Sequence, residues 1–223
     1  MPDGTYRVER VRLFKEKGRE RYLSQEDAGL LLAACNLDLR IVVLAAMHTG
    51  FRSSELKSLT WRNVDLVNLS ATVLNRYSKN DETRTVPLSP DLAAALQKLK
   101  NERKPADDDP VFMINGKPWV CWKEAFNAAV ERAGITDFHF HDLRHCYGSW
   151  LAMNNVPDKG RMDLMGHKDP KMTMRYTHLS MEYKRQAIQK LPSFDIVNGE
   201  NVPAESHQIS QRPETRKVVT FVK

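Results

Sequence analysis

The sequence predicts an α+β fold that is mainly α-helical, with a small antiparallel β-sheet inserted early in the chain. Helix start and stop signals recur along most of its length, whereas one pair of β-prone runs flanks a polar turn at residues 78–82. The chain has 223 residues, 41% of them hydrophobic, which suffices to bury a substantial core. We place a basic leader or linker at 1–21, the folded domain at 22–191 and a polar tail at 192–223.

Local signals define each element in order. The capping box Ser24–Asp27 opens the first helix, and Ser89-Pro90 supplies the N-cap and N1 residues of a later one. Gly50 and Gly134 follow two of the helical patterns and predict their ends. After the first helix we expect helices over Leu39–His48, Arg52–Leu59, Asp91–Lys100, Trp119–Ala133, Asp142–Met153, Pro157–Met165, Pro170–His178 and Met181–Leu191. The strands are Ala71–Tyr77 and Thr83–Leu88, with a short third strand at Val111–Ile114.

Composition restricts the class of protein. The net charge of +6 suggests a polyanionic partner without proving one. No apolar run approaches the length of a membrane span, and the first residues do not form a secretory signal, so we expect a cytoplasmic protein. The three cysteines are widely spaced with no CxxC pair, which disfavours a disulfide framework and a cysteine zinc site. We therefore interpret Cys35, Cys121 and Cys146 as small core residues.

Several polar residues can carry chemistry, and each also has an ordinary structural explanation. Arg52 and Glu55 lie three apart on a predicted helix, so they form either a surface ion pair or part of an anion site at its first turn. Lys79 at the hairpin tip is either a solvated charge or a mobile proton donor. Tyr176 lies in a locally basic stretch, where the default is a half-buried ring with a hydrogen-bonded hydroxyl.

A pair of histidines raises one further hypothesis, a zinc hydrolase. His141 and His145 are four residues apart, the spacing of two zinc ligands on a helix. However, the guanidinium of Arg144 would oppose a cation there, and Asp142 is one methylene shorter than the glutamate that such sites use as base. The sequence therefore disfavours a zinc site.

Taken in chain order, these residues resemble the tyrosine recombinase (phage integrase) family over roughly 21–191. The motifs that carry the resemblance are Thr49-Gly-x-Arg52-x-x-Glu55-Leu56, Lys79 ahead of Arg84-x-Val-Pro-Leu88, His141-x-x-Arg144-His145, and Gly166-His167 nine residues before Tyr176. Met165 stands where members of the family usually have leucine. No N-terminal helical core-binding domain precedes Arg21, so the resemblance is to an isolated catalytic domain with the tyrosine recombinase catalytic-domain fold.

The resemblance implies a site-specific DNA recombinase or integrase that cuts and rejoins strands through a 3′-phosphotyrosine intermediate. Two arginine forks can hold a phosphate and supply the positive charge that a metal would otherwise provide, so we expect no cofactor and no metal. Tyr176 would be the nucleophile and Lys79 the general acid. We expect Glu55 to orient an arginine, and His145 to serve structure by capping or by orienting the groups that contact the phosphate. The implied catalytic set is Arg52, Lys79, His141, Arg144, His167 and Tyr176, with His141 as the expected proton acceptor or phosphate donor and His167 contacting the phosphate or Tyr176.

The implied partner is double-stranded DNA at the bacterial nucleoid, with self-association into a tetramer, a contribution from accessory DNA-bending proteins and no membrane. The tail after Leu191, including the β-prone end Val218–Val222, either docks on a neighbouring protomer or is disordered. The alternatives are a topoisomerase-like strand passer and a non-catalytic DNA-binding regulator that retains the fold. The same residues fit integration, excision, inversion or resolution, and a phage, genomic-island or host protein.

Overall fold

The computed structural model describes residues 21–74, 83–174, 176 and 188. The chain divides into two compact units, Met1–Ser180 and Met181–Lys223, and the fold described below belongs to the first. In the second unit only Ile188 is described, as a helical and exposed residue. Within the described residues no helix is long and apolar enough to cross a membrane. The predicted leader up to residue 20, Lys79 and the predicted tail lie outside the described residues.

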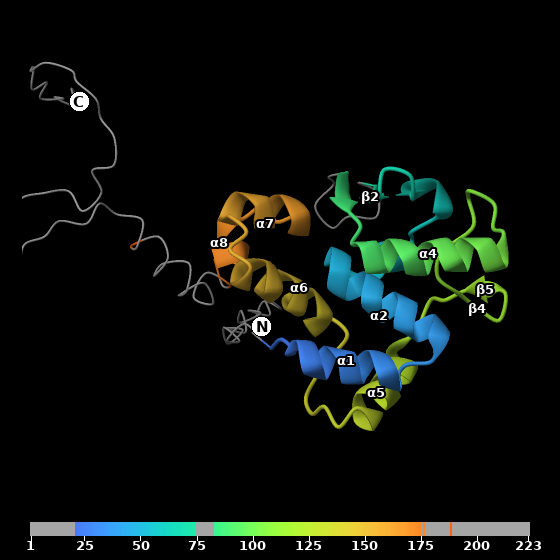
Figure 1. The fold of residues 1–223 in the computed structure, drawn as a ribbon, viewed down its shortest axis with the longest axis horizontal. Coiled ribbons are helices and arrows are strands. Elements are labelled where there is room, and N and C mark those ends of the chain that lie inside the picture. The colour runs from blue at the N-terminus through green and yellow to red at the C-terminus, as the bar shows by residue number, and fades with distance from the viewer. Residues whose placement is uncertain (1–20, 75–82, 175, 177–187, 189–223) are drawn as a thin grey trace, which may run out of the picture. The chain divides into compact units, whose positions relative to one another are not determined.

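Helix α2 (Leu37–Thr49) is the central element of the first unit (Figure 1). It packs against α6 (Asp142–Met153), α4 (Pro90–Arg103), α1 (Gln25–Ala34) and α3 (Ser53–Lys57). Its buried side chains, among them Val42 and Val43, belong to the main hydrophobic core. The predicted uniform apolarity of this helix is thus explained, because neighbours cover it on several faces.

The remaining helices extend this arrangement. Helix α5 (Lys123–Arg132) packs on α1, and α7 (Asp158–Met165) packs on α6, on α8 (Pro170–Met174) and on strand β3 (Arg84–Pro87). One 3₁₀ turn, Trp61–Asn63, follows α3. The placement of α7 across both α6 and β3 brings the predicted polar motifs of three chain segments to one end of the unit.

Most helix ends form where the sequence signals lie. The Ser24 hydroxyl accepts from the Asp27 N–H at 3.0 Å, and Ser89 accepts from Leu92 N–H at 3.3 Å. Gly50 ends α2 in the left-handed region with a φ of 63°. The predicted helix over Asp142–Met153 has the observed bounds of α6. These ends are confirmed because a cap depends on residues within one turn of the chain.

The predicted hairpin is present within a three-stranded antiparallel sheet. Strand β2 (Ser70–Val73) pairs with β3, and the additional strand β1 (Val64–Asp65) pairs with β2. A second two-stranded sheet, β4 (Met113–Ile114) with β5 (Lys117–Pro118), was not predicted as a hairpin. Its turn is Asn115-Gly116, with φ values of 51° and 73°, a pair typical of tight hairpin turns.

Three of the predicted helices were too long by more than two residues. The helix expected from Arg52 to Leu59 spans only Ser53–Lys57, because Arg52 has extended backbone angles and acts as the N-cap. The helix expected to begin at Trp119 begins at Lys123, because the buried Trp119 indole donates to the Cys121 carbonyl in an irregular segment before it. The helix expected to reach His178 ends at Met174, and Tyr176 lies in a turn.

The cysteines divide between core and surface. Cys35 and Cys146 are buried, as predicted, whereas Cys121 is exposed, so its interpretation as a core residue is wrong. It lies in the irregular segment before α5, where its backbone carbonyl accepts a hydrogen bond from the Trp119 indole. Among the described residues all three thiols are free.

The C-cap of α2 generates a stability prediction. A Cβ at Gly50 would lie 2.4 Å from Tyr147 Cδ1, whereas a Cβ at Gly134, with a similar φ of 69°, meets nothing within 4 Å. Gly134→Ala should therefore lose about 1–2 kcal/mol of unfolding free energy from backbone strain alone. Gly50→Ala should lose about 1–3 kcal/mol more, because the ring must move.

Urea unfolding of both variants and the wild type measures this difference. Equal losses at the two glycines would contradict the close packing of Tyr147 on the end of α2.

Candidate active site

A buried carboxylate organises the cationic end of the unit. The Glu55 side chain is fully buried and accepts from Arg52 Nη1 at 2.9 Å and from the Arg52 backbone N–H at 2.7 Å. Arg84 grips the same carboxylate with both Nη atoms, at 3.0 and 2.6 Å. The i, i+3 pairing of Arg52 with Glu55 is present as the sequence predicted, but it is a buried pair and not a surface one.

The ionisation of Glu55 reflects these partners. Burial acts to raise its pKa, but the hydrogen bonds and charge of Arg84, with further contributions from Arg52 and Arg144, lower the pKa from 4.5 to about 2. The carboxylate therefore stays ionised over the physiological pH range and holds two guanidinium groups at fixed positions.

Arg84 was not among the predicted site residues, although its motif was noted. The strand alternates, with Val86 and Leu88 buried and Thr85 exposed, so Arg84 shares the buried face. That period of two was the signal that could have found it. Its side chain passes Gly166, where a Cβ would lie 2.9 Å from Arg84 Cδ, and its guanidinium lies 5.2 Å from the centre of the Phe51 ring.

Arg144 joins the ends of two helices. Its Nη1 donates to the carbonyl of Gly50, which ends α2, and its Nη2 donates to the carbonyl of Met165, the last residue of α7. Helix ends leave carbonyls without intrahelical donors, and both helices end at a left-handed glycine, here Gly50 and Gly166. Arg144, only 5% exposed as a residue, thus satisfies backbone carbonyls from two segments far apart in sequence.

The field at Arg144 is strongly positive. Burial together with the charges of Arg52 and Arg84 lowers its pKa to about 9, and Glu55 only partly opposes them. Three guanidinium groups therefore gather around one carboxylate, an arrangement that a bound anion would stabilise.

The Tyr176 phenol lies in the same unit, and its hydroxyl is 2.7 Å from His145 Nδ1. Tyr176 is 3% exposed and belongs, with Tyr147, Ala152 and Met165, to a small hydrophobic cluster separate from the main core. Gly148 makes room for the ring, since a Cβ there would lie 2.8 Å from Tyr176 Cζ. Electrostatic interaction between Tyr176 and Arg144 places the phenol within the field of the arginine cluster.

The other two predicted histidines are each linked to this pair. His167 Nδ1 is 2.8 Å from Thr173 Oγ1, and the Tyr176 N–H donates to the Thr173 carbonyl at 3.1 Å. His141 is the exposed N-cap of α6, and its ring meets that of His145 edge to face with centroids 5.3 Å apart.

The structure therefore brings together most of the predicted set, and it adds Arg84. Arg52, Glu55, Arg144 and Tyr176 are linked by ion pairs or electrostatic interactions, and His145 joins Tyr176 directly. Lys79 lies outside the described residues. No group of three or more His, Cys, Asp or Glu residues that could hold a metal ion occurs in the part of the chain that the structure describes.

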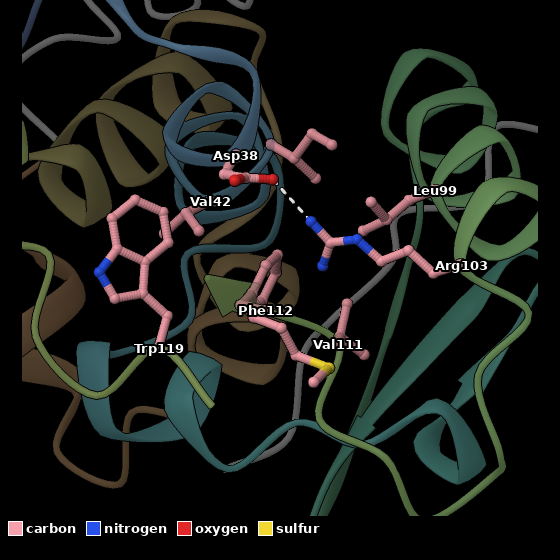
Figure 2. Close-up of a pocket in the computed structure, with 9 residues that line it drawn as sticks. Asp38, Val42, Leu99, Arg103, Val111, Phe112 and Trp119 are labelled. Carbon is pink, nitrogen blue, oxygen red and sulfur yellow. Dashed lines mark hydrogen bonds and ion pairs between the residues drawn. The ribbon is translucent and has the colours of Figure 1, made fainter. Parts of the chain in front are cut away.

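A pocket between α2, α4 and residues 111–119 lies elsewhere, and Figure 2 shows it. None of its nine lining residues is a candidate site residue. Its polar feature is the bond from Arg103 Nη2 to Asp38 at 2.6 Å, surrounded by apolar side chains. The arginine cluster and not this pocket is thus the centre of the candidate chemistry.

Comparisons with known proteins agree on one family. The family model described as the phage integrase family matches residues 21–183. The integrase of Salmonella phage P22 is 30% identical over 199 residues, which cover 85% of this chain and 51% of that protein. The chain thus spans about half the length of the curated relatives it matches.

Solved structures share the fold. The catalytic domain of bacteriophage HP1 integrase is 30% identical with a TM-score of 0.59, covering 76% of this chain and 94% of that one. The Tn1549 transposon integrase in complex with a circular intermediate DNA has a TM-score of 0.66 at 21% identity, covering 80% of this chain and 68% of that one.

The depressed pKa of Glu55 generates a prediction of acid sensitivity. Since the pKa falls from 4.5 to about 2 on folding, the carboxylate stabilises the native state fully above about pH 4.5 and loses this contribution as the pH falls toward 2. Glu55→Gln should lose about 3 kcal/mol of unfolding free energy at pH 7. It should also show a shallower loss of stability between these pH values.

Denaturant unfolding from pH 2 to 7 measures both effects. The matched control is Glu102→Gln, which removes an exposed carboxylate 3.9 Å from Lys98 and should change stability by less than about 1 kcal/mol. An unchanged acid slope in Glu55→Gln would contradict the assigned role of the carboxylate.

Proposed function

The chain belongs to the phage integrase family, and on that premise we propose that it is a site-specific DNA recombinase that cuts and rejoins strands by transesterification. The observation that carries the proposal is a buried tyrosine that interacts electrostatically with Arg144, which itself lies in a cluster with Arg52 and Arg84. The Tn1549 integrase, which has the same fold, was solved with DNA, and the same polyanion fits the net charge of +6 of this chain.

The arginine cluster would hold the scissile phosphate. The two described hydrogen bonds of Arg144 use two of its five N–H groups, so the others can grip a phosphate oxygen, and Arg52 can supply a second fork. One such charge at about 4 Å contributes roughly 4 kcal/mol at an effective dielectric near 20, before desolvation costs. Burial and, after it, the charges of Arg52 and Arg84 lower the pKa of Arg144, and a bound phosphate would offset the repulsion among these guanidinium groups.

The reaction would exchange one phosphodiester for another. The phenolic proton of Tyr176 passes to a neighbouring acceptor and Oη attacks the phosphorus. The bond from phosphorus to the 5′ oxygen breaks, and Lys79 protonates that oxygen. The result is a 3′-phosphotyrosine and a free 5′-hydroxyl, which later attacks in the reverse sense, so no ATP is needed. His141 and the Nε2 side of His167 would donate to the phosphate as charge develops on its oxygens. The fixed guanidinium groups supply the positive charge that stabilises this transition state.

Covalent trapping tests the chemistry. Wild-type protein mixed with labelled, nicked DNA at low salt in EDTA should form an adduct on a denaturing gel. Tyr176→Phe should form none, and Lys79→Ala should form it at least about 100-fold more slowly, the lower range for loss of a general acid.

Tyr147→Phe is the matched control, because this second buried phenol lies nearby but its pKa is raised by burial to about 12. The Tyr147→Phe variant should still form the covalent DNA adduct. An adduct that survives Tyr176→Phe, or one that needs an added divalent metal, would overturn the mechanism. DNA binding without any adduct would favour a regulator that keeps the fold without turnover.

We also propose that the chain acts as a tetramer on double-stranded DNA, assisted by DNA-bending proteins, and that residues after Leu191 dock on a neighbouring protomer. Removing residues 192–223 should then abolish strand exchange, which needs the assembly, while single-site DNA binding by gel shift stays within about threefold of the full chain. Recombination at the full-chain rate by the shortened protein would refute the docking.

A further inference from the structure

The contact between His145 and Tyr176 has a chemical consequence that the predicted roles did not include. The two side chains come from α6 and from the turn after α8, and Tyr176 Oη lies 2.7 Å from His145 Nδ1. The rings lie at 48° with centroids 6.0 Å apart, so the hydroxyl meets the imidazole at its nitrogen and not at its face. A general base must lie within hydrogen-bond reach of the proton it removes, and His145 does.

Burial restricts where the phenolic proton can go. Tyr176 is 3% exposed and His145 is 8% exposed, so bulk water has little access to the hydroxyl. Gly148 and Met165 pack on the ring and hold it in this position. A phenol has a pKa near 10, so at neutral pH its attack on phosphorus requires a proton acceptor already in contact.

Two neighbours complete the arrangement. The positive charge of Arg144 interacts with ionised Tyr176, and because this interaction is reciprocal it favours the phenolate as the proton leaves. His141, which the sequence suggested as acceptor, is the exposed N-cap of α6, and its ring packs edge to face on His145 one turn away.

We propose that His145 is the catalytic residue that accepts the proton of Tyr176 during cleavage and returns it during rejoining. The assignment rests on the proposed function. In it His145 takes the place of His141 as the proton acceptor. In the step, Oη forms a bond to phosphorus and its proton passes to Nδ1. The bond from phosphorus to the 5′ oxygen breaks, and that oxygen takes its proton from the acid assigned to Lys79. Before the step the neutral ring carries its proton on Nε2, since Nδ1 accepts.

The test separates holding the phenol from accepting its proton. In His145→Asn the amide oxygen takes the place of Nδ1, one bond from Cγ, so it can accept the hydrogen bond but cannot hold the proton. Single-turnover adduct formation on nicked DNA should fall at least about 100-fold, with DNA affinity within about threefold of wild type. A fluorinated tyrosine at position 176, whose phenol ionises near neutral pH, should restore most of the rate to His145→Asn. A packing defect would not respond to the acidity of the phenol.

The matched control is His139→Asn, which changes an exposed histidine just before α6 and should leave the rate unchanged. If His145→Asn fails to bind DNA, His145→Gln carries the same prediction, because its amide is equally unable to hold the proton. If the wild type forms the adduct and His145→Asn forms it at the same rate, the assignment of His145 is overturned while the proposed function stands. So would a slow variant that the fluorinated tyrosine does not restore. Absence of an adduct from the wild type itself would overturn the proposed function, and this assignment with it.

Discussion

A buried guanidinium is the constraint on which this end of the molecule depends. Arg144 is 5% exposed, and its cost of burial is offset by the backbone carbonyls of Gly50 and Met165 and by the charge of Glu55. Because those carbonyls end α2 and α7, the same side chain that would bind a phosphate also fixes where two helices terminate. The candidate site therefore contributes to the packing of the fold and is not confined to its surface.

Charge balance explains why the cluster is stable yet ready for an anion. Glu55 neutralises part of the field and fixes both Arg52 and Arg84, which reach it from α3 and β3. Burial first, and then the charges of Arg52 and Arg84, lower the pKa of Arg144, and the charge of Glu55 opposes them only in part. A phosphate would complete the balance, so binding and electrostatic relief would coincide. Preorganised donors of this kind do not need to reorient as charge develops in a transition state.

The sequence predicted the features that depend on neighbouring residues, and it missed the side-chain contacts that form between segments far apart in the chain. The caps at Ser24 and Ser89 and the bounds of α6 follow from neighbouring residues, and the family motifs identified most of the polar cluster. The role of Arg84 was missed because it depends on a glutamate 29 residues away. Likewise, neither spacing nor motif order showed that the phenol bonds His145, 31 residues earlier, since that contact requires the turn after α8 to pack on α6.

The described contacts of Tyr176 lie outside the main hydrophobic core, and this has a consequence for the proposed chemistry. Its ring belongs to a four-residue cluster outside the main core, closed by Gly148 and by the link from His167 through Thr173. Segments with small buried clusters open at lower free energy than the core around them. The proposed nucleophile could therefore be displaced without unfolding α2 and its neighbours, while the arginines, bound to backbone and carboxylate, stay in place. A rigid anion site combined with a separately held phenol would suit the proposed reaction, in which a covalent intermediate must persist while DNA strands exchange.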